Sequence, residues 1–169
     1  MKYKKVKNRE LHRIVSTVII YKGNKYLITK RSLDKKVWPG KWTVPGGGLE
    51  IDDYVNLKPT TRSKQWYFAL ANSLKREIKE EIGVKAGEIK YLLDLAFIRS
   101  DNIPVITLSF YAAWIKGKVK LNNESTDYAW ITAKEVNNYD LIEGIDVEIK
   151  MVDRILNGKD PSKVKFTQK

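Results

Sequence analysis

The sequence predicts a single α/β domain, because segments with the pattern of strands alternate with segments that have the period of helices. The runs from Ile14 to Tyr21 and from Val105 to Ile115 are rich in β-branched and other apolar residues, which is typical of strands. A helix with one buried face is indicated by apolar residues at every fourth position: Trp66, Leu70, Leu74, Ile78 and Ile82. The chain has 169 residues, enough for one domain with a hydrophobic core.

The composition restricts the chemistry that the chain can perform. There is no cysteine and a single histidine, His12, so disulfides, thiolate zinc sites, cysteine nucleophiles and clusters of imidazole ligands are excluded. Any metal ion must therefore be held by oxygen ligands. No apolar run approaches the length of about 18 residues needed for a membrane span, and residues 1–7 lack the apolar core of a signal peptide. We expect a cytoplasmic protein that does not contact the membrane.

The formal net charge is +12, and much of the excess lies at the two ends of the chain. Residues 1–13 form a basic lead that contains Lys2, Lys4, Lys5, Lys7 and Arg9, and the tail contains Lys159, Lys163, Lys165 and Lys169. A basic field attracts polyanions such as nucleotides or RNA, although the same charge also serves solubility alone. Nucleic-acid binding has no support from a motif, because no arginine-rich run, zinc finger or RNP-type aromatic pattern accompanies the charge.

The first half of the domain, taken in order, begins with a predicted hairpin. The strand from Ile14 to Tyr21 and a second one from Tyr26 to Arg31 are joined by the turn residues Gly23-Asn24. After a polar loop over residues 32–41, a short strand from Trp42 to Pro45 runs into the glycine turn Gly46-Gly47-Gly48. Glycine lets a backbone approach a ligand closely, although an ordinary turn has the same composition.

The polar segment over residues 49–64 contains Pro59 among serine and threonine residues, which indicates a loop. We expect the long helix to begin at Gln65. Its first aromatic residues, Trp66, Tyr67 and Phe68, are expected to pack in the core, with a lid or a homodimer contact as the alternatives.

In the second half we expect strands from Gly87 to Arg99 and from Val105 to Ile115, an edge strand from Lys118 to Leu121, and a short strand from Tyr128 to Ile131. The sequence Thr132-Ala133-Lys134-Glu135 fits a capping box that starts a short helix. A final amphipathic helix, with Ile145, Ile149 and Val152 on one face, ends at Asn157-Gly158. Residues 158–169 are expected to form a solvated tail.

Three carboxylates gather near the end of the long helix. Glu77, Glu80 and Glu81 stand at i, i+3 and i+4 and therefore project to one side within a turn. Their mutual repulsion and the helix dipole each cost a few tenths of a kcal/mol, and a hard cation such as Mg²⁺ would compensate. The alternative is a solvated acidic helix end, partly neutralised by Arg76 and Lys79. Gly83 closes the helix where a left-handed C-cap is expected.

The run Arg76-Glu77-Ile78-Lys79-Glu80-Glu81-Ile82-Gly83-Val84 resembles the second half of the Nudix box, G-x5-E-x7-R-E-U-x-E-E-x-G-U with U aliphatic, at every specified position. Gly46-Gly47 with the preceding Gly40-Lys41-Trp42 and Pro45 resembles its first half and the usual lead-in. The chain is thereby identified as a member of the Nudix (MutT-like) hydrolase family.

The resemblance departs from the pattern in two places. Counting on from Gly47, the position of the first box glutamate is taken by Asp53. Between Asp53 and Arg76 lie residues 54 to 75, which are 22 residues where the pattern has seven. The insertion, at about residues 54–68, splits the box, and we expect it to displace Asp53 from the site.

The family resemblance implies an α/β/α sandwich with a mixed β-sheet over residues 14–157, in which the box helix carries the metal site. It implies Mg²⁺, with Mn²⁺ as a substitute, bound by the Gly47 carbonyl and the carboxylates of Glu77, Glu80 and Glu81. The implied reaction is hydrolysis of a phosphoanhydride bond in a nucleoside diphosphate linked to another group. The lead-in favours nucleoside triphosphates, whether ribo or deoxy, as substrates.

The same resemblance assigns roles to residues in and around the box. Glu77, or the loop acid Glu124, would accept the proton of the attacking water, and Arg76 would orient Glu77. The alternative interpretation is that Glu124 is an ordinary acidic residue of a surface loop. Candidate substrate-binding residues are Lys30, Arg31 and Trp42. The competing hypothesis for the whole chain is a Nudix-fold module that binds nucleotides or RNA without turnover.

Overall fold

The computed structural model describes residues 10–167, so the lysines of the basic lead before residue 10 and Lys169 lie outside the described part. The strands are β1 (Arg13–Lys22), β2 (Lys25–Arg31), β3 (Trp42–Thr43), β4 (Gly46–Gly48), β5 (Lys85–Ala86), β6 (Lys90–Ile98), β7 (Pro104–Lys116) and β8 (Ser125–Ile131). The helices are α1 (Asp52–Val55), α2 (Ala69–Ile82), α3 (Ile145–Leu156) and the short 3₁₀ turns η1 (Val136–Asn138) and η2 (Pro161–Lys163). None of the helices in this part of the chain has the length and apolar content that crossing a membrane requires.

The strands form one mixed sheet in the described part of the chain. β1 lies beside β7 in parallel, with Arg13 opposite Val105 and Tyr21 opposite Ala113. β2, β4 and β6 run antiparallel to their neighbours, and β1 pairs with β2 near one end and with β4 near the other. β4 therefore occupies the space that opens where β1 and β2 diverge.

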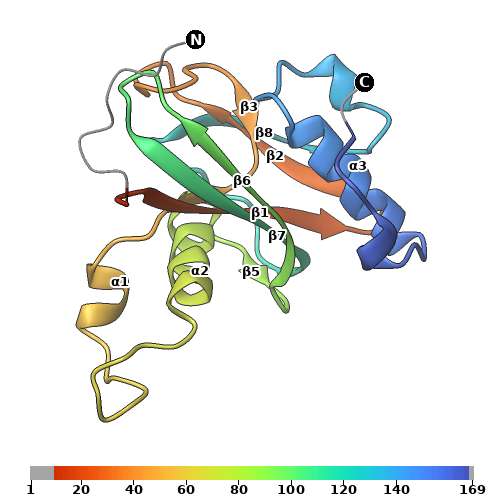
Figure 1. The fold of residues 1–169 in the computed structure, drawn as a ribbon. Helices are drawn as coiled ribbons and strands as arrows, with labels where there is room; N and C mark the ends of the chain where they lie inside the picture. Colours follow the sequence, from red (N-terminus) through yellow and green to blue (C-terminus); the bar gives the residue numbers. More distant parts are fainter. Residues whose placement is uncertain (1–9, 168–169) are drawn as a thin grey trace.

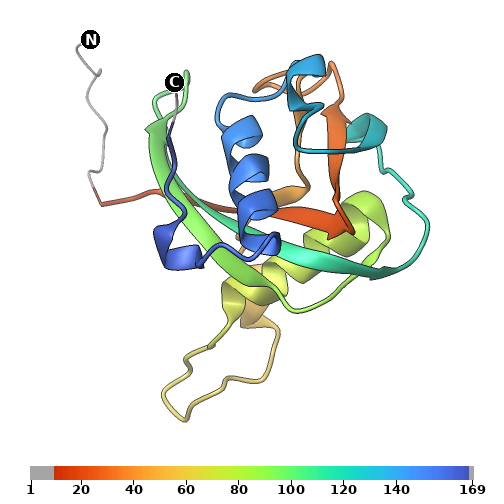
Figure 2. The same ribbon diagram turned by 90° about the vertical axis from the view of Figure 1, so that its right-hand side faces the viewer.

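Alternation along the central strands builds two cores. Ile19 of β1, with Tyr26 and Ile28 of β2, packs on one face with Ile149 and Val152 of α3. The neighbouring positions point to the other face: Val18 and Ile20 of β1 and Leu27 of β2 pack there with Leu74, Ile78 and Ile82 of α2. Figures 1 and 2 show α2 and α3 on opposite sides of the sheet. The predicted α/β/α sandwich with a mixed sheet is confirmed.

Most predicted strands are found, but three local expectations were wrong. The glycine turn is strand β4, whose residues pair with Val15, Ser16 and Thr17 of β1. The strand expected to begin at Gly87 begins only at Lys90, as β6, and a separate short strand, β5, precedes Gly87. The edge strand expected from Lys118 to Leu121 is absent from the described structure, because this segment instead closes the end of α2: the Lys120 N–H donates to the Ile82 carbonyl at 3.0 Å.

The insertion forms a projection below the sandwich in Figure 1. It begins within the short helix α1, which the sequence did not indicate, and contains a turn in which the Thr60 N–H donates to the Gln65 carbonyl at 2.8 Å. The helix α2 begins at Ala69 and not at Gln65, because Phe68 adopts a left-handed backbone conformation with φ 63°. The insertion therefore does not lengthen the box helix.

The aromatic residues of the insertion do not pack as expected. Trp66 contacts Tyr54 in a tilted arrangement with 5.5 Å between ring centroids, and its indole N–H donates to the Leu57 carbonyl. Tyr67 and Phe68 are 59% and 79% exposed, so core packing is wrong for these two residues. The lid and the homodimer contact stay predictions.

The C-terminal elements follow the sequence more closely. The Thr132 N–H and hydroxyl both donate to Glu135, which supports the predicted capping box before η1. α3 has the predicted extent and buries Ile149 and Val152 completely. The tail is not solvated throughout, because η2 folds it back and Phe166 lines a cavity beside α3.

Candidate active site

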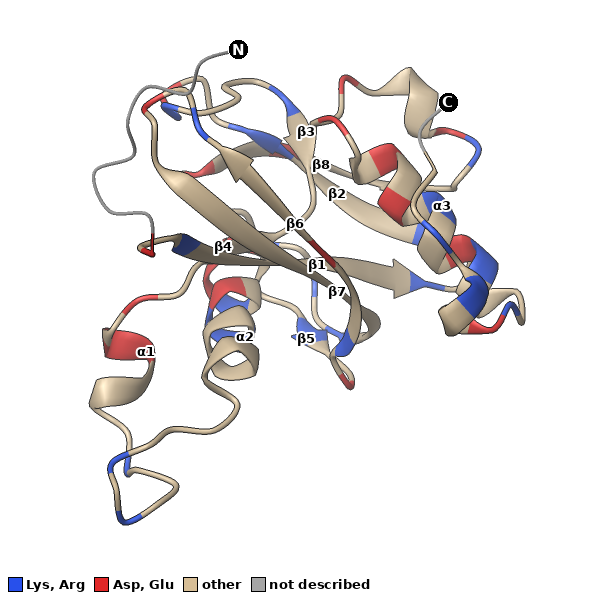
Figure 3. Cartoon of the chain, in the orientation of Figure 1, with Lys and Arg blue, Asp and Glu red and all other residues tan. Residues whose placement is uncertain are grey.

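The end of α2 places the three box glutamates beside the glycine strand β4. Leu74, Ile78 and Ile82 fix the rotation of the helix by burying its apolar face against the sheet. Gly83 ends the helix with φ 65°, and its N–H donates to the carbonyls of Ile78 and Lys79, which confirms the predicted left-handed cap. Figure 3 shows acidic residues gathered on α2 close to β4.

Glu77 and Glu81 contact β4 directly. A Cβ atom added at Gly47 would lie 2.1 Å from Glu77 Oε1, so only glycine leaves room for this carboxylate. Glu81 Oε2 accepts a hydrogen bond from the Gly46 N–H at 2.8 Å. Gly46 has φ 156°, and a Cβ there would meet the Ser16 carbonyl oxygen of β1 at 2.2 Å. The glycines are thus required by the close packing of α2, β4 and β1.

Asp53 lies in the site, and the expectation that the insertion displaces it was wrong. Arg76 donates to Asp53 through Nε at 2.5 Å and Nη2 at 3.1 Å, a bidentate pair. The Asp53 side chain is only 3% exposed and also accepts from the Glu50 N–H. These contacts lower the pKa of Asp53 to about 2, with the hydrogen bond from Arg76 as the largest cause. The insertion begins just after Asp53, and the chain then returns to α2 beside it, so Arg76 still contacts Asp53.

Arg76 connects Asp53 to the box glutamates. Its Nη1 atom lies 3.0 Å from Glu77 Oε1 and donates to Glu80 Oε2 at 3.0 Å. The bond to Asp53 raises the pKa of Arg76 further above its ordinary value, so the guanidinium is always charged. Glu80, with a side chain 55% exposed, is turned to Arg76 in this arrangement.

Glu124 reaches the site from the loop before β8. The Asn122 N–H donates to the Glu81 carbonyl at the end of α2, and Asn122 Oδ1 accepts from the Glu124 N–H at 2.9 Å. The Glu124 carbonyl accepts from the Ser32 N–H at 2.8 Å, and its carboxylate pairs with Lys35 at 2.5 Å. The loop is therefore tied both to α2 and to the segment that follows β2.

The charges of this cluster influence one another. The pKa of Glu81 is raised to about 7, first by burial and then by the negative charges of Glu77 and Glu124, against the hydrogen bond from the Gly46 N–H. Burial is also the main reason why the pKa of Glu77 is raised, with Arg76 opposing it. The pKa of Arg31 is lowered by burial, while Glu81 and Glu124 act in the opposite direction. Arg31 therefore lies close enough to Glu81 and Glu124 to interact with both electrostatically.

The structure brings together most of the residues selected from the sequence. Gly47, Arg76, Glu77, Glu80, Glu81, Glu124 and Arg31 lie in the cluster on the α2 side. Lys30 stands two positions after Ile28, which packs in the core on the α3 side, so alternation along β2 places Lys30 on that opposite face. Trp42 packs against Tyr139 on the α3 side at 5.0 Å between ring centroids.

The sequence interpretation missed Lys35 and discounted Asp53. Lys35 stands in a polar loop with no periodic pattern, and its partner Glu124 is 89 positions away, so no local signal indicated the pair. Asp53 had the correct spacing from Gly47 as its signal, and only the length of the insertion argued against it.

The donor atoms of the cluster suit a hard divalent cation. The carboxylates of Glu77 and Glu81 and the backbone of Gly47 supply oxygen atoms only, which is the ligand chemistry that Mg²⁺ prefers. Within residues 10–167, no group of three acidic or histidine side chains is already arranged as a complete metal site. Since Glu80 is paired with Arg76, its carboxylate would have to turn in order to join the other two.

Comparison with known proteins gives relatives of one family. The curated nucleoside triphosphatase NudI of Klebsiella pneumoniae (strain 342) is 32% identical over 139 residues, which cover 76% of this chain and 86% of that protein. No protein-family model matches the chain.

Solved structures agree on the fold. A MutT NUDIX hydrolase from Burkholderia pseudomallei has a TM-score of 0.66 at 17% identity and covers 83% of this chain and 98% of its own. The NUDIX domain of Shewanella oneidensis NrtR, in complex with ADP ribose, has a TM-score of 0.66 at 17% identity and covers 90% and 94%. At such identities the likeness establishes the fold alone. With the sequence relationship to NudI, it follows that the chain belongs to the Nudix family and is an enzyme of the Nudix hydrolase class.

Proposed function

We propose that this Nudix hydrolase acts on nucleoside triphosphates and cleaves a phosphoanhydride bond with the help of Mg²⁺. The observation that carries the proposal is the contact of Glu77 with Gly47 and of Glu81 with the Gly46 N–H, beside the basic side chains of Arg31 and Lys35. Carboxylates that can bind a cation therefore lie next to positively charged side chains that can bind phosphate. The name of the 32% identical relative, nucleoside triphosphatase NudI, supports the substrate class.

Glu77, Glu81 and the Gly47 carbonyl would hold the cation, with Glu80 joining them when it leaves Arg76. When bound, the divalent cation supplies positive charge to the phosphate oxygens and makes a neighbouring water more acidic. Mn²⁺ has similar ligand preferences and would substitute. The pKa of Glu81 is raised first by burial and also by the negative charge of Glu77, so the two ionised carboxylates gain from a cation between them.

The side chains around the carboxylates have separate tasks. Arg31 and Lys35 bind phosphate oxygens, and Lys35 exchanges Glu124 for the substrate. Arg76, held by Asp53, keeps Glu77 in one orientation. Two carboxylates are candidates to accept the proton of the attacking water: Glu77, which is already oriented, and Glu124, which is 46% exposed to solvent.

The test is a hydrolysis assay with a panel of ribo- and deoxyribonucleoside triphosphates and ADP-ribose, with Mg²⁺ or Mn²⁺. We expect a nucleoside monophosphate and pyrophosphate, or a diphosphate and phosphate, from at least one triphosphate. The pH profiles of Glu77→Gln and Glu124→Gln identify the base, because loss of the base removes the acidic limb of the profile. Absence of hydrolysis throughout the panel would contradict the proposal and favour a binding module.

Metal binding has a readout that does not need activity. A cation that binds the folded chain at about ten times its Kd stabilises it by roughly 1.4 kcal/mol, which is a melting shift of a few degrees for a domain of this size. Glu77→Gln should lose most of the shift, whereas the matched control Glu88→Gln, which lies outside the cluster, should keep it. An equal shift in both variants would mean that the cation binds elsewhere.

A further inference from the structure

Six exposed lysines gather at one end of the sheet, next to the C-terminal end of α2. They belong to the β1–β2 hairpin, to β5, to β7 and to the segment after β7, and we call them the lysine patch: Lys22, Lys25, Lys85, Lys116, Lys118 and Lys120. The Lys120 N–H donates to the Ile82 carbonyl at 3.0 Å, which joins the patch to α2. Figure 3 shows basic residues on β5, which follows α2 in the chain. Because these lysines are far apart in the sequence, only the fold brings them together.

The strand register places four of the lysines in two directly opposed pairs. Lys85 of β5 faces Lys116 of β7, and Lys22 of β1 faces Lys25 of β2. Trp114 connects the two pairs: it lies two residues before Lys116, and the Lys22 Nζ atom lies 4.0 Å from the centroid of its ring. Trp114 packs against the core on the α2 side, so the patch lies on that face of the sheet.

The positive charge of the patch is not balanced within the described chain. Like charges that face each other across a sheet destabilise it, and here two such pairs occur side by side. No ion pair joins any of the six lysines to an acidic side chain in residues 10–167. Glu135 interacts electrostatically with Lys25, but its carboxylate accepts from Thr132. The patch would therefore gain from an anionic partner.

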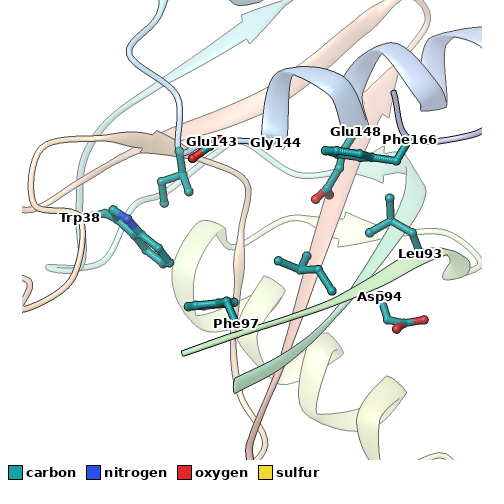
Figure 4. Close-up of a pocket in the computed structure, with 10 residues that line it drawn as sticks. Trp38, Leu93, Asp94, Phe97, Glu143, Gly144, Glu148 and Phe166 are labelled. Atoms are coloured by element: carbon teal, nitrogen blue, oxygen red, sulfur yellow. The ribbon is translucent and has the colours of Figure 1, made fainter. Parts of the chain in front are cut away.

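The patch is separate from the sites on the rest of the molecule. The glycine strand of the glutamate cluster pairs with the start of β1, where Thr17 faces Gly46. Lys22 lies five residues further along β1, which is roughly 16 Å away. The cavity of about 580 Å³ in Figure 4 lies on the α3 side, and none of the described residues that line it is basic. The lysines thus form a surface of their own.

We propose that the lysine patch binds nucleic acid through the phosphate backbone, without reading the base sequence. A nucleic-acid strand carries closely spaced negative charges, and each lysine that neutralises a phosphate releases counterions. Lysine is a point charge with three donors, which suits phosphate oxygens in any orientation. An anionic membrane is less favoured, because membrane binding also depends on inserted apolar side chains. Ile115 is exposed in this region, but alternation along β7 points it to the face opposite Lys116.

The test measures the anisotropy of a labelled oligouridylate that ends in a 5′-hydroxyl, in the presence of EDTA. Neither a bound cation nor a terminal phosphate can then engage the glutamate cluster. With about four lysines on phosphates, log K should fall with log[salt] at a slope of about −2.8, so affinity weakens roughly 50-fold between 50 and 200 mM salt. Lys85→Gln/Lys116→Gln loses two contacts. Its slope should be smaller by about 1.4, and its affinity at 50 mM salt at least about tenfold weaker.

Lys159→Gln/Lys163→Gln is the matched control, because it removes the same charge from two exposed lysines outside the patch. It should keep the wild-type slope and affinity. Equal weakening in both double variants would show that the net charge of the whole chain attracts RNA, and this result would overturn the proposal. Absence of binding by the wild type at 50 mM salt would also overturn it.

Thermal melting checks that the patch variant is folded. Lys85→Gln/Lys116→Gln removes opposed charges, so its melting temperature should be no lower than that of wild type. Lys118→Gln/Lys120→Gln leaves both opposed pairs in place and is the second variant, with the same expected loss of RNA affinity. Unchanged RNA affinity in both folded variants would refute the patch.

Two further measurements separate this inference from its alternatives. Vesicles of phosphatidylcholine and phosphatidylserine test an anionic membrane: sedimentation with vesicles that depends on the patch, without RNA binding, would overturn the proposal in favour of a membrane. Nucleoside triphosphate hydrolysis should be unchanged in Lys85→Gln/Lys116→Gln, because neither lysine lies in the glutamate cluster. RNA binding needs no turnover, so failure of the proposed function would leave this inference standing, and the reverse also holds.

Discussion

Glu81 on the α2 side and Glu148 on the α3 side are both buried carboxyl groups whose pKa is raised to about 7, but their surroundings differ. Glu81 accepts from a backbone N–H and lies in the field of two further acids, with Arg31 and Lys35 nearby. Glu148 has the Ser109 hydroxyl as a donor and lines a cavity together with Asp94 and Glu143. Burial is the largest cause in both cases, so the raised pKa alone does not assign a role to either group.

What separates the two groups is the number and kind of their neighbours. A cluster of ionised carboxylates is stabilised by a cation, whereas a buried carboxyl group with few partners is stabilised by keeping its proton. The following predictions test this contrast between the two faces of the sheet, beginning with the largest expected effect.

Removal of one charge from the α2 face should affect catalysis most. Glu77→Gln and Glu81→Gln should each lower turnover by about 100-fold or more, because each removes an oxygen ligand or a base. Both variants should unfold no more easily than wild type in EDTA, since repulsion within the cluster is relieved. Steady-state kinetics and thermal melting check the two statements, and near-full activity in both variants would disprove the active-site assignment.

On the α3 face, the ionisation of Glu148 should make the free energy of unfolding depend on pH. The folded state keeps the proton of Glu148 up to a pH of about 7, whereas the unfolded chain loses it near 4.5, so the free energy of unfolding falls as pH rises through this window. Between pH 5 and pH 8 the loss from this group is about 2.5 kcal/mol. Urea titrations of wild type and Glu148→Gln should converge toward pH 5 and separate at pH 8, with the variant more stable. Parallel curves would show that Glu148 is not desolvated in the folded state.

Two adjacent glycines of β4 should respond differently to the same change. In Gly47→Ala the new Cβ meets the end of a flexible side chain, so Glu77 moves aside and turnover falls by roughly 10- to 100-fold while the fold persists. In Gly46→Ala it meets the backbone of β1 at a strained φ, so stability falls by about 1–3 kcal/mol. Kinetics together with melting distinguish these outcomes, and a fully active Gly47→Ala enzyme would contradict the placement of Glu77.

Substitution of Asp53 should lower turnover less than substitution of Glu77 or Glu81. Asp53→Asn weakens the bidentate contact with Arg76 and should lower turnover by about tenfold through a less ordered Glu77. Asp53→Glu keeps the charge and is the control that should retain most activity. If Asp53→Asn has wild-type kinetics, Arg76 orients Glu77 without its help.

The smallest effect is expected from the insertion. Replacement of residues 58–64 by two glycines should change stability by less than about 1 kcal/mol, because loop length contributes only about 0.6 kcal/mol per doubling. The remaining residues keep the contact of Trp66 with Leu57 and that of Arg76 with Asp53. A change of KM with an unchanged melting temperature would identify the projection as a lid, and unfolding of the variant would show that it stabilises the domain.

The order of strands and helices and the box glutamates could be predicted because local patterns encode them. The spacing of Leu74, Ile78 and Ile82 defines the buried face of α2 and thereby the side on which Glu77 and Glu81 project. Gly83 marks the helix end because few other residues adopt its backbone conformation. These signals act within a few residues, so one sequence suffices to read them.

Tertiary structure decided the contacts between distant segments. The sequence interpretation treated the insertion as a displacement of Asp53, but the path of the inserted residues returns Arg76 to Asp53, 23 positions later in the chain. The pairing of Lys35 with Glu124 and the position of Glu148 above Ser109 likewise depend on how strands are ordered in the sheet. Residue types fix what a side chain can do, whereas burial and the neighbours brought by the fold fix which of these chemical roles it performs.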